Sequence, residues 1–286
     1  EKAVKNVNTI IAPEIIKYDV FNQTEIDQKM IEIDGTPNKS KLGANAILSV
    51  SIAALRAAAK TKNQYIYKHL TKSDNFIMPL PMMNVLNGGS HADNNVDIQE
   101  FMIVPVGAAS FKHAIQMGAE IFHTLKHILK KEGLTTSVGD EGGFAPNLKN
   151  NEDALMYLSN SISDAGYQVG EEIKIALDVA SSELYDNKKN KYKLGSEGSY
   201  LSSKELVDYY LGLCKKYPII SIEDGLDQND WDGWIKMNKI LGKKIQIVGD
   251  DLTVTNPMKL KKAIKENAMN AILIKLNQIG TVTETL

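Results

Sequence analysis

The stretch IKIALDVA, residues 173–180, is a near-continuous apolar run that carries one acidic residue close to its end. Three more runs of this kind follow along the chain: PIISIEDG at 218–225, IQIVGDD at 245–251 and AILIKLNQ at 271–278. Runs rich in Val, Ile and Leu that begin about 25 to 45 residues apart, with helix-like sequence between them, predict parallel strands joined by helical crossovers. The sequence therefore predicts an α/β fold. The pattern leaves open whether the sheet closes into a barrel or stays open and doubly wound.

Each of the four runs ends in a charged side chain, in chain order Asp178, Glu223, Asp250 and Lys275. Side chains alternate between the two faces of a strand, so Asp178 shares a face with Ala176, and that face is apolar at depth and charged at its carboxyl end. Ligands bind at the carboxyl ends of parallel strands in barrels and in open sheets alike. Three carboxylates that converge there raise one another's pKa values, and a hard cation such as Mg²⁺ relieves their repulsion. The pattern predicts a divalent-metal site, with a purely structural carboxylate cluster as the alternative.

Lys275 stands in a run of Ile and Leu that we expect to form a buried strand. A buried ammonium either costs several kcal/mol or gives up its proton, and a neutral amine beside bound cations is available as a general base near neutral pH. The alternative is a strand end at which the lysine stem packs and the ammonium reaches solvent. The charged ends of the other three runs favour the catalytic interpretation.

Two glycine-flanked stretches place further polar groups in loops. They are SVGDEGGFAPN at 137–147 and LNGGSHADNNVDIQEF at 86–101, and their candidate residues are Asp140, Glu141, His91, Gln99 and Glu100. Taken alone, each stretch has an alternative to a functional role: the first can be an exposed acidic loop, and the second an ordinary turn. The sequence NGGS lacks the glycine spacing of a P-loop or of a dinucleotide-binding turn, so neither motif predicts nucleotide binding.

Two long helices are predicted outside these runs. Residues 41–60 are rich in strong helix formers and apolar on all sides, which predicts a well-buried helix. A second helical pattern spans about 110 to 132 and carries His123 and His127 on one face. No HExxH sequence accompanies this pair, so we interpret both as surface or packing histidines rather than metal ligands.

Composition excludes several classes of protein. A net charge of -2 and a pI near 6.3 provide no electrostatic basis for binding nucleic acid or an anionic membrane. The single cysteine, Cys214, rules out an internal disulfide and fits a reducing compartment. No apolar run approaches the roughly 20 residues of a membrane helix. We expect a cytoplasmic protein.

A change in character along the chain predicts a domain boundary. Residues 71–82, TKSDNFIMPLPM, contain a polar patch followed by two prolines, which predicts domains at 1–72 and 73–286. The chain begins at Glu1 and stops at TVTETL, within a helical pattern. We therefore expect both ends to be truncated.

Six stretches together resemble the enolase family, and HADNNVDIQE resembles its bacterial members. They are LNGGSHADNNVDIQEFMIVPVGA, VGDEGGFAPN, LDVASSE, SIEDGLDQNDWDGW, VGDDLTVTN and ILIKLNQIGT. These motifs are long, follow the family's order, and extend the resemblance from about residue 34 to the end of the chain. The resemblance, rather than any spacing, implies a TIM-like barrel with six of its eight strands present. It also implies that residues 1–72 are the C-terminal part of a small α+β N-terminal domain.

The resemblance implies a glycolytic activity, the Mg²⁺-dependent reversible dehydration of 2-phosphoglycerate to phosphoenolpyruvate. Carried over motif by motif, Asp178, Glu223 and Asp250 resemble the metal ligands. Lys275 resembles the base that removes the proton beside the substrate carboxylate, and Glu141 the acid that helps the hydroxyl group leave. That acid has to be protonated when it donates, which favours a position near another acid such as Glu100. Glu100, His91, Gln99 and Lys275 are implied to contact substrate.

The family pattern also contains segments that are absent from this sequence. They are a serine-bearing loop before Glu1, and two strands with a second lysine after Leu286. We expect that the isolated chain neither closes its barrel nor turns over substrate. Family members form homodimers or larger assemblies, and some also occur at the cell surface.

Two other functions remain open. One is an enzyme of the same superfamily that acts on a different carboxylic acid, although the stretches GDEGG and IQEF favour enolase. The other is a non-catalytic binding or structural protein on the same scaffold. The charged strand ends argue against it, since a purely structural protein does not need them.

Overall fold

The computed structural model describes residues 1–71 and 73–286, and the chain divides into two compact units. The first unit comprises Glu1–Ile77, Thr253–Lys262 and Leu273–Leu286, and the second comprises Met78–Leu252 and Ala263–Ile272. The predicted boundary between 1–72 and 73–286 falls on residue 72, which lies outside the described residues. That boundary stays a prediction.

The first unit is helical. Its elements are α1 (Lys2–Asn6), a π-helical turn (Val7–Ile11), α2 (Ala12–Ile15), α3 (Gln23–Asp34), α4 (Ala44–Thr61), α5 (Ile66–His69), α11 (Leu276–Ile279) and α12 (Val282–Thr285). The helix predicted at 41–60 is α4, and it begins after Gly43, which has a left-handed φ of 96°. The core of this unit joins the first turns of the chain to α3 and α4 through Ile11, Ile26, Met30, Leu42, Ala46 and Ile47.

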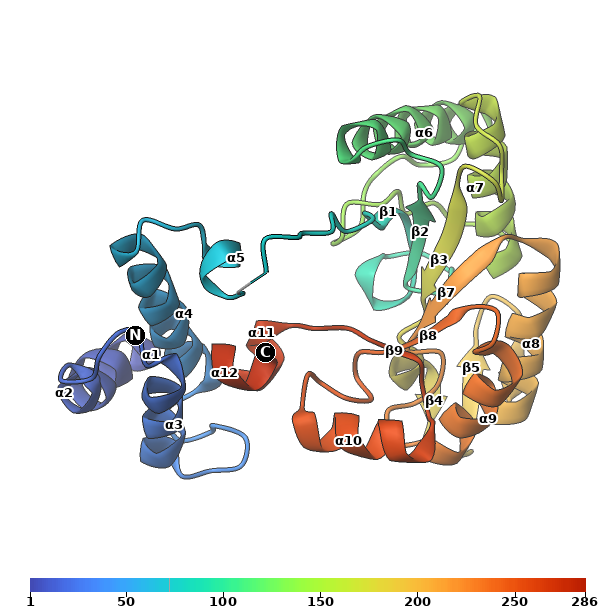
Figure 1. Cartoon of the computed structure of the whole chain (residues 1–286). Helices are drawn as coiled ribbons and strands as arrows, with labels where there is room; N and C mark the ends of the chain where they lie inside the picture. The colour runs from blue at the N-terminus through green and yellow to red at the C-terminus, as the bar shows by residue number, and fades with distance from the viewer. Residues whose placement is uncertain (72) are drawn as a thin grey trace. The chain divides into compact units, whose positions relative to one another are not determined.

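The C-terminal segment completes this helical unit, and Figure 1 shows α11 and α12 beside α4. The Val282 N–H donates to Ser51 Oγ at 2.9 Å, and the Thr283 N–H donates to Asp27 Oδ2 at 3.0 Å. Glu284 forms an ion pair with the buried Lys39 at 2.9 Å. All three partners are buried polar groups of α3, α4 or the loop between them. The segment therefore satisfies groups that would otherwise be costly to bury.

The second unit contains a six-stranded sheet in the order β1-β2-β3-β7-β8-β9. The strands are β1 (Met83–Asn87), β2 (Glu100–Val104), β3 (Lys174–Asp178), β7 (Ile219–Glu223), β8 (Gln246–Gly249) and β9 (Ala271–Ile272). The last four are parallel, which confirms the prediction from the four apolar runs. Strand β2 runs antiparallel to both of its neighbours. In the described part of the chain β1 and β9 are edge strands, so the sheet is not closed into a barrel.

Helices lie along one side of this sheet (Figure 1): α6 (Phe111–Lys131), α7 (Asn151–Asp164), α8 (Ser203–Lys216) and α9 (Trp231–Leu241). Helix α6 matches the helix predicted at about 110 to 132 and buries Met117, Ile121, Leu125 and Leu129, four residues apart on one face. His123 and His127 are exposed on it. The remaining helix, α10 (Pro257–Glu266), contributes residues to both units.

A small sheet and an apolar cluster complete the second unit. Strands β4 (Tyr185–Asp186), β5 (Lys191–Leu194) and β6 (Ser199–Leu201) form an antiparallel sheet between β3 and α8 in the sequence. In the main sheet, Ala176 pairs with Met102 across β3 and β2, and both pack with Val104. Ala176 lies two residues before Asp178, so the face that carries this carboxylate is apolar at depth, as predicted.

The strand predicted at 271–278 is much shorter than expected. Strand β9 ends at Ile272, Lys275 is the N-cap of α11, and its side chain is exposed rather than buried. The neighbouring Ile274 is 50% exposed. The prediction of a buried strand around Lys275 is wrong: among the described residues β9 pairs with β8 alone, and this pairing ends at Ile272. Beyond Ile272 the backbone finds other partners, and the Lys275 N–H donates to Thr255 Oγ1 at 2.9 Å.

Across residues 1–71 and 73–286, no helix combines the length and the apolar character that a membrane crossing requires.

Candidate active site

A row of acidic side chains crosses the carboxyl end of the main sheet. Asp178 ends β3 and is paired in register with Glu100 on β2 and with Glu223 on β7. Residues directly opposite each other on neighbouring strands point to the same face, about 5 Å apart. Glu223 is paired in turn with Val248 on β8. Asp250 lies two residues beyond Val248, just past the end of β8, which favours the same face, and its charge acts on Asp178. Strand register thus brings three of the predicted residues, Glu100, Asp178 and Glu223, into one row, with Asp250 just beyond the next strand.

Asp178 is the buried centre of this row. Its Oδ2 accepts a hydrogen bond from Gln99 Nε2 at 3.0 Å, and its Oδ1 accepts one from the Ala180 N–H at 3.1 Å. Burial is the main cause that raises the pKa of Asp178 from 3.8 to about 7; the negative charges of Glu100 and Asp250 contribute to the rise, and the two hydrogen bonds oppose it. Burial, together with the neighbouring negative charges, therefore disfavours ionisation of the central member of this row.

Gln99 was predicted to contact substrate, and in the structure its amide contacts Asp178. Ser90 Oγ donates to Gln99 Oε1 at 2.9 Å, which leaves the Nε2 group directed at the carboxylate. Gln99 is buried, and Ser90 belongs to the short 3-10 turn Gly89–His91. Sequence reasoning did not identify Ser90. This relay fixes the orientation of the Asp178 carboxylate.

A second acidic group lies where β7 and β8 end. One carboxylate oxygen from each of Asp224, Asp250 and Asp251 lies within 4.8 Å of the other two. Burial, together with the charges of Asp251 and Asp178, raises the pKa of Asp224 to about 7 against the opposing effect of hydrogen bonds from the Asp250 and Asp251 amides. Sequence reasoning selected Asp250 and missed the other two. The available signal was that both IEDG and VGDD contain two adjacent acids.

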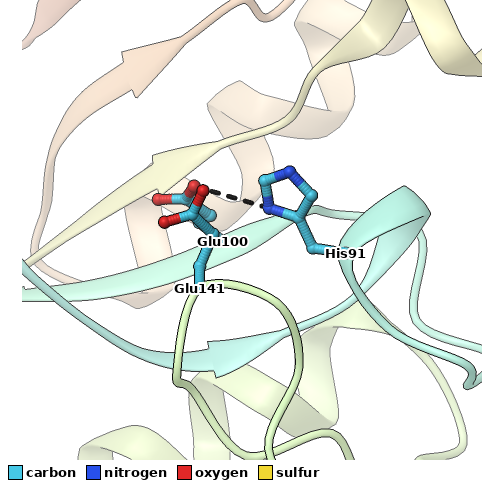
Figure 2. Close-up of side chains that lie close together, drawn as sticks. All are labelled: His91, Glu100 and Glu141. Atoms are coloured by element: carbon cyan, nitrogen blue, oxygen red, sulfur yellow. Dashed lines mark ion pairs between the residues drawn. The ribbon is translucent and has the colours of Figure 1, made fainter.

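A third group contains His91, Glu100 and Glu141, whose side chains face one another in Figure 2. His91 Nδ1 lies 3.7 Å from Glu100 Oε1, and one ligand atom of each of the three residues lies within 4.8 Å of the others. Glu100 is partly buried at the start of β2, whereas Glu141 is exposed in a loop. The fold thus brings Glu141 beside Glu100, the arrangement that the resemblance implied.

Glycines let the Glu141 loop approach the end of β1 and the turn of His91. The Asp140 N–H donates to the His91 carbonyl at 3.0 Å, and the Gly143 N–H donates to Asn87 Oδ1 at 2.9 Å. A Cβ at Gly139 would come within 2.4 Å of the His91 carbonyl oxygen, and one at Gly143 within 2.7 Å of the Leu86 nitrogen. These two glycines are needed for close backbone contact, which holds Glu141 beside β2.

Lys275 belongs to the first compact unit, whereas the other predicted site residues belong to the second. Its backbone is held by Thr255, whose Oγ1 accepts from the Lys275 N–H and donates to Gln278 Oε1 at 2.8 Å. Thr255 is buried and has a left-handed φ of 55°, which is unusual for a β-branched residue. The start of α11 is therefore tied to a strained turn of the same unit.

Two family models match almost the whole chain. The enolase N-terminal domain matches residues 1–70, and the enolase C-terminal TIM barrel domain matches residues 75–286. The chain belongs to the enolase family. Enolases are lyases that act on small molecules and depend in general on Mg²⁺. The six-stranded sheet is accordingly part of an enolase TIM-barrel domain, and its acidic row lies where such domains bind ligands.

The acidic side chains at this end of the sheet are candidates for holding a magnesium ion, and Asp250 belongs to one group whose carboxylate oxygens lie within 4.8 Å of one another. Carboxylate oxygens are the hard ligands that Mg²⁺ prefers. Burial, and after it the charges of Glu100 and Asp250, raise the pKa of Asp178, and a bound cation would relieve the repulsion among these charges. A structural carboxylate is normally stabilised by donors instead. The donor set and its electrostatics therefore agree with the metal dependence of the family.

Proposed function

We propose that this chain carries catalytic residues of a bacterial-type glycolytic enolase, which removes water reversibly from 2-phosphoglycerate to form phosphoenolpyruvate. The observation that carries the proposal is the row of Glu100, Asp178 and Glu223 on three adjacent strands, with Asp250 just beyond the next strand. Carboxylates in a row of this kind can hold a cation. A cation there would stabilise an intermediate that carries two negative charges on a carboxylate.

Asp178, Glu223 and Asp250 would hold the magnesium ion. Bound there, Mg²⁺ supplies positive charge to the substrate carboxylate while negative charge accumulates on it. The pairing of a Lys or His base with one or two such ions is a general property of the enolase superfamily. Gln99, oriented by Ser90, keeps Asp178 in a fixed position for this task.

Two proton transfers complete the reaction. Lys275 takes the proton from the carbon beside the carboxylate, and the electron pair of that C–H bond remains on the substrate. The C–O bond at the next carbon then breaks, a carbon–carbon double bond forms, and Glu141 donates the proton that converts the departing hydroxide into water. Glu100, next to Glu141, supports this acid, and His91 contacts the same pair. Replacing Lys275 and Glu141 one at a time separates the two transfers, because each variant lacks only one of the two groups.

The test is a measurement of phosphoenolpyruvate by its absorbance, with 2-phosphoglycerate and Mg²⁺, in this 286-residue chain and in a version extended at both ends. We expect turnover in the extended version, and loss of it in the Glu141→Gln variant of that version. A panel of other carboxylic acids measured in parallel identifies a different superfamily activity. Absence of turnover with every acid would favour a binding or structural role instead.

We also propose a cytoplasmic location and a homodimer or larger assembly. The single cysteine, which fits a reducing compartment, supports the first, and the tendency of family members to form dimers or larger assemblies supports the second. Cell fractionation and light scattering of the purified protein test these two points separately.

A further inference from the structure

Asp224 connects the ends of three strands through its backbone. It follows β7 directly, its N–H donates to the Val248 carbonyl at 3.0 Å, and its own carbonyl accepts from the Ser181 N–H at 3.0 Å. Ser181 lies just beyond β3 and Val248 lies in β8. The residue is 4% exposed and has a left-handed φ of 43°, a conformation that Asp tolerates better than most side chains. It is therefore fixed at the centre of the rim.

The side chain of Asp224 holds the segment that carries Asp250. Its Oδ1 accepts from the Asp250 N–H at 3.0 Å, and its Oδ2 accepts from the Asp251 N–H at 2.8 Å. One buried carboxylate thus binds two consecutive amides of the loop after β8. The position of a side chain follows from its own backbone, so these two bonds determine where the Asp250 carboxylate can lie.

We propose that Asp224 is a positioning residue for the metal site, acting through the backbone of Asp250 and Asp251; this rests on the proposed role of Asp250 as a magnesium ligand. Both oxygens of Asp224 are engaged by amides, and its backbone joins β3 to β8. Residues that orient a metal ligand without binding the metal typically change metal affinity about 10- to 100-fold when they are replaced.

The test is titration of the 286-residue chain with Mg²⁺ by calorimetry. In Asp224→Asn the amide group keeps one acceptor but turns a donor toward the second N–H, so we expect magnesium affinity to fall about 10-fold. Asp224→Ala removes both acceptors, and the expected fall is about 100-fold. Unchanged affinity in both variants would overturn the proposal.

Asp227→Asn is the matched control. Asp227 lies in the same loop, is 8% exposed, and its Oδ1 likewise accepts a backbone N–H, that of Asn229, at 2.8 Å. This side chain accepts from Asn229 rather than from the amides of Asp250 or Asp251. We expect wild-type magnesium affinity in this variant, and an equal loss in it would reduce the role of Asp224 to general support of the loop, which overturns the proposal.

Amide hydrogen exchange in the absence of metal separates this proposal from the proposed function. We expect faster exchange at the Asp250 and Asp251 amides in Asp224→Asn, with the amides of α6 unchanged as evidence of intact folding. If wild type and Asp178→Asn give the same magnesium titration, the proposed metal site is wrong, whatever the exchange result. If Asp178→Asn loses magnesium while Asp224→Asn keeps both wild-type affinity and wild-type exchange, the positioning role alone is wrong.

Discussion

Two buried aspartates, Asp34 in the helical unit and Asp178 in the sheet unit, have opposite electrostatic behaviour. Asp34 ends α3 and is 1% exposed, and Asp178 ends β3 and is 8% exposed. Burial raises the pKa of Asp34, but hydrogen bonds from the Thr36 hydroxyl and from the backbone of Leu42 and Thr36 outweigh it, and its pKa falls below 3.8. Burial and the charges of other acids raise the pKa of Asp178 to about 7. Two aspartates that both expose little surface therefore differ in the direction of their pKa shift.

The difference lies in what surrounds each carboxylate. Asp34 accepts from the Leu42 N–H at 2.7 Å and from Thr36, so its charge closes the loop between α3 and α4. Asp178 also accepts two hydrogen bonds, yet it shares its face with Glu100 and Asp250. A carboxylate among donors stabilises the fold, whereas one among other carboxylates is stabilised by a cation.

The largest expected effect concerns Lys275, the proposed base. In Lys275→Ala, exchange of the proton beside the substrate carboxylate should fall about 10²- to 10⁴-fold, because the base is gone. Magnesium affinity should stay at its wild-type value. The measurement is isotope exchange in the extended protein, with the exposed Lys265 replaced by Ala as control. Wild-type exchange in Lys275→Ala would remove this lysine from the base role.

Replacing the donor-bound aspartate should destabilise the protein. Asp34→Ala leaves the buried Leu42 N–H and the Thr36 groups without their acceptor, and we expect a loss of about 3 kcal/mol in the free energy of unfolding. Urea denaturation measures this change. Asp208→Ala, at an exposed ion pair with Lys204, is the control and should cost about 0.5 kcal/mol or less. A loss below about 1 kcal/mol in Asp34→Ala would contradict the proposed closing of the loop.

Replacing Asp178, the aspartate near other acids, should change the free energy of unfolding in the opposite direction. At pH 8 without Mg²⁺, Asp178→Asn removes a buried carboxyl group that is costly to ionise. We therefore expect stabilisation on the order of 1 kcal/mol. The same variant should lose the rise in melting temperature that Mg²⁺ produces in the wild type. Thermal unfolding with and without Mg²⁺ measures both effects. Destabilisation of the metal-free variant would show that the Asp178 carboxylate stabilises the fold, as we expect for Asp34.

The smallest effect is the pH dependence of the metal-free wild type. Asp178 has a folded pKa of about 7 and an ordinary value of 3.8, so the folded state binds more protons between these pH values. The free energy of unfolding contributed by this group therefore falls as pH rises from about 4 to about 7. Asp34 contributes in the other direction, since its stabilisation is present above pH 3.8 and is lost as pH falls through its lowered pKa. Urea midpoints at pH 5 and pH 7.5, compared with those of Asp178→Asn, test the sign: the variant should show the flatter profile.

The prediction that failed concerns Lys275 and illustrates what periodicity cannot show. The run AILIKLNQ has the composition of a buried strand, yet only Ala271 and Ile272 pair with β8. Whether a strand continues depends on hydrogen-bonding partners from distant segments. For Lys275 that partner is the side chain of Thr255, 20 residues earlier in the chain.

The amino-acid sequence by itself determined the family, the parallel order of four strands, and the shared face of Asp178, Glu223 and Asp250. The family is determined by six long motifs in a fixed order, and the strands and their shared face by local composition and the two-residue period of a strand. Only the tertiary structure decided that β2 is antiparallel, that Asp224 binds the amides of Asp250 and Asp251, and that the C-terminal segment packs on α3 and α4. The physical reason is that these features are hydrogen bonds and packing contacts between distant segments, and the partner of a buried polar group is chosen by folding rather than by its neighbours in sequence.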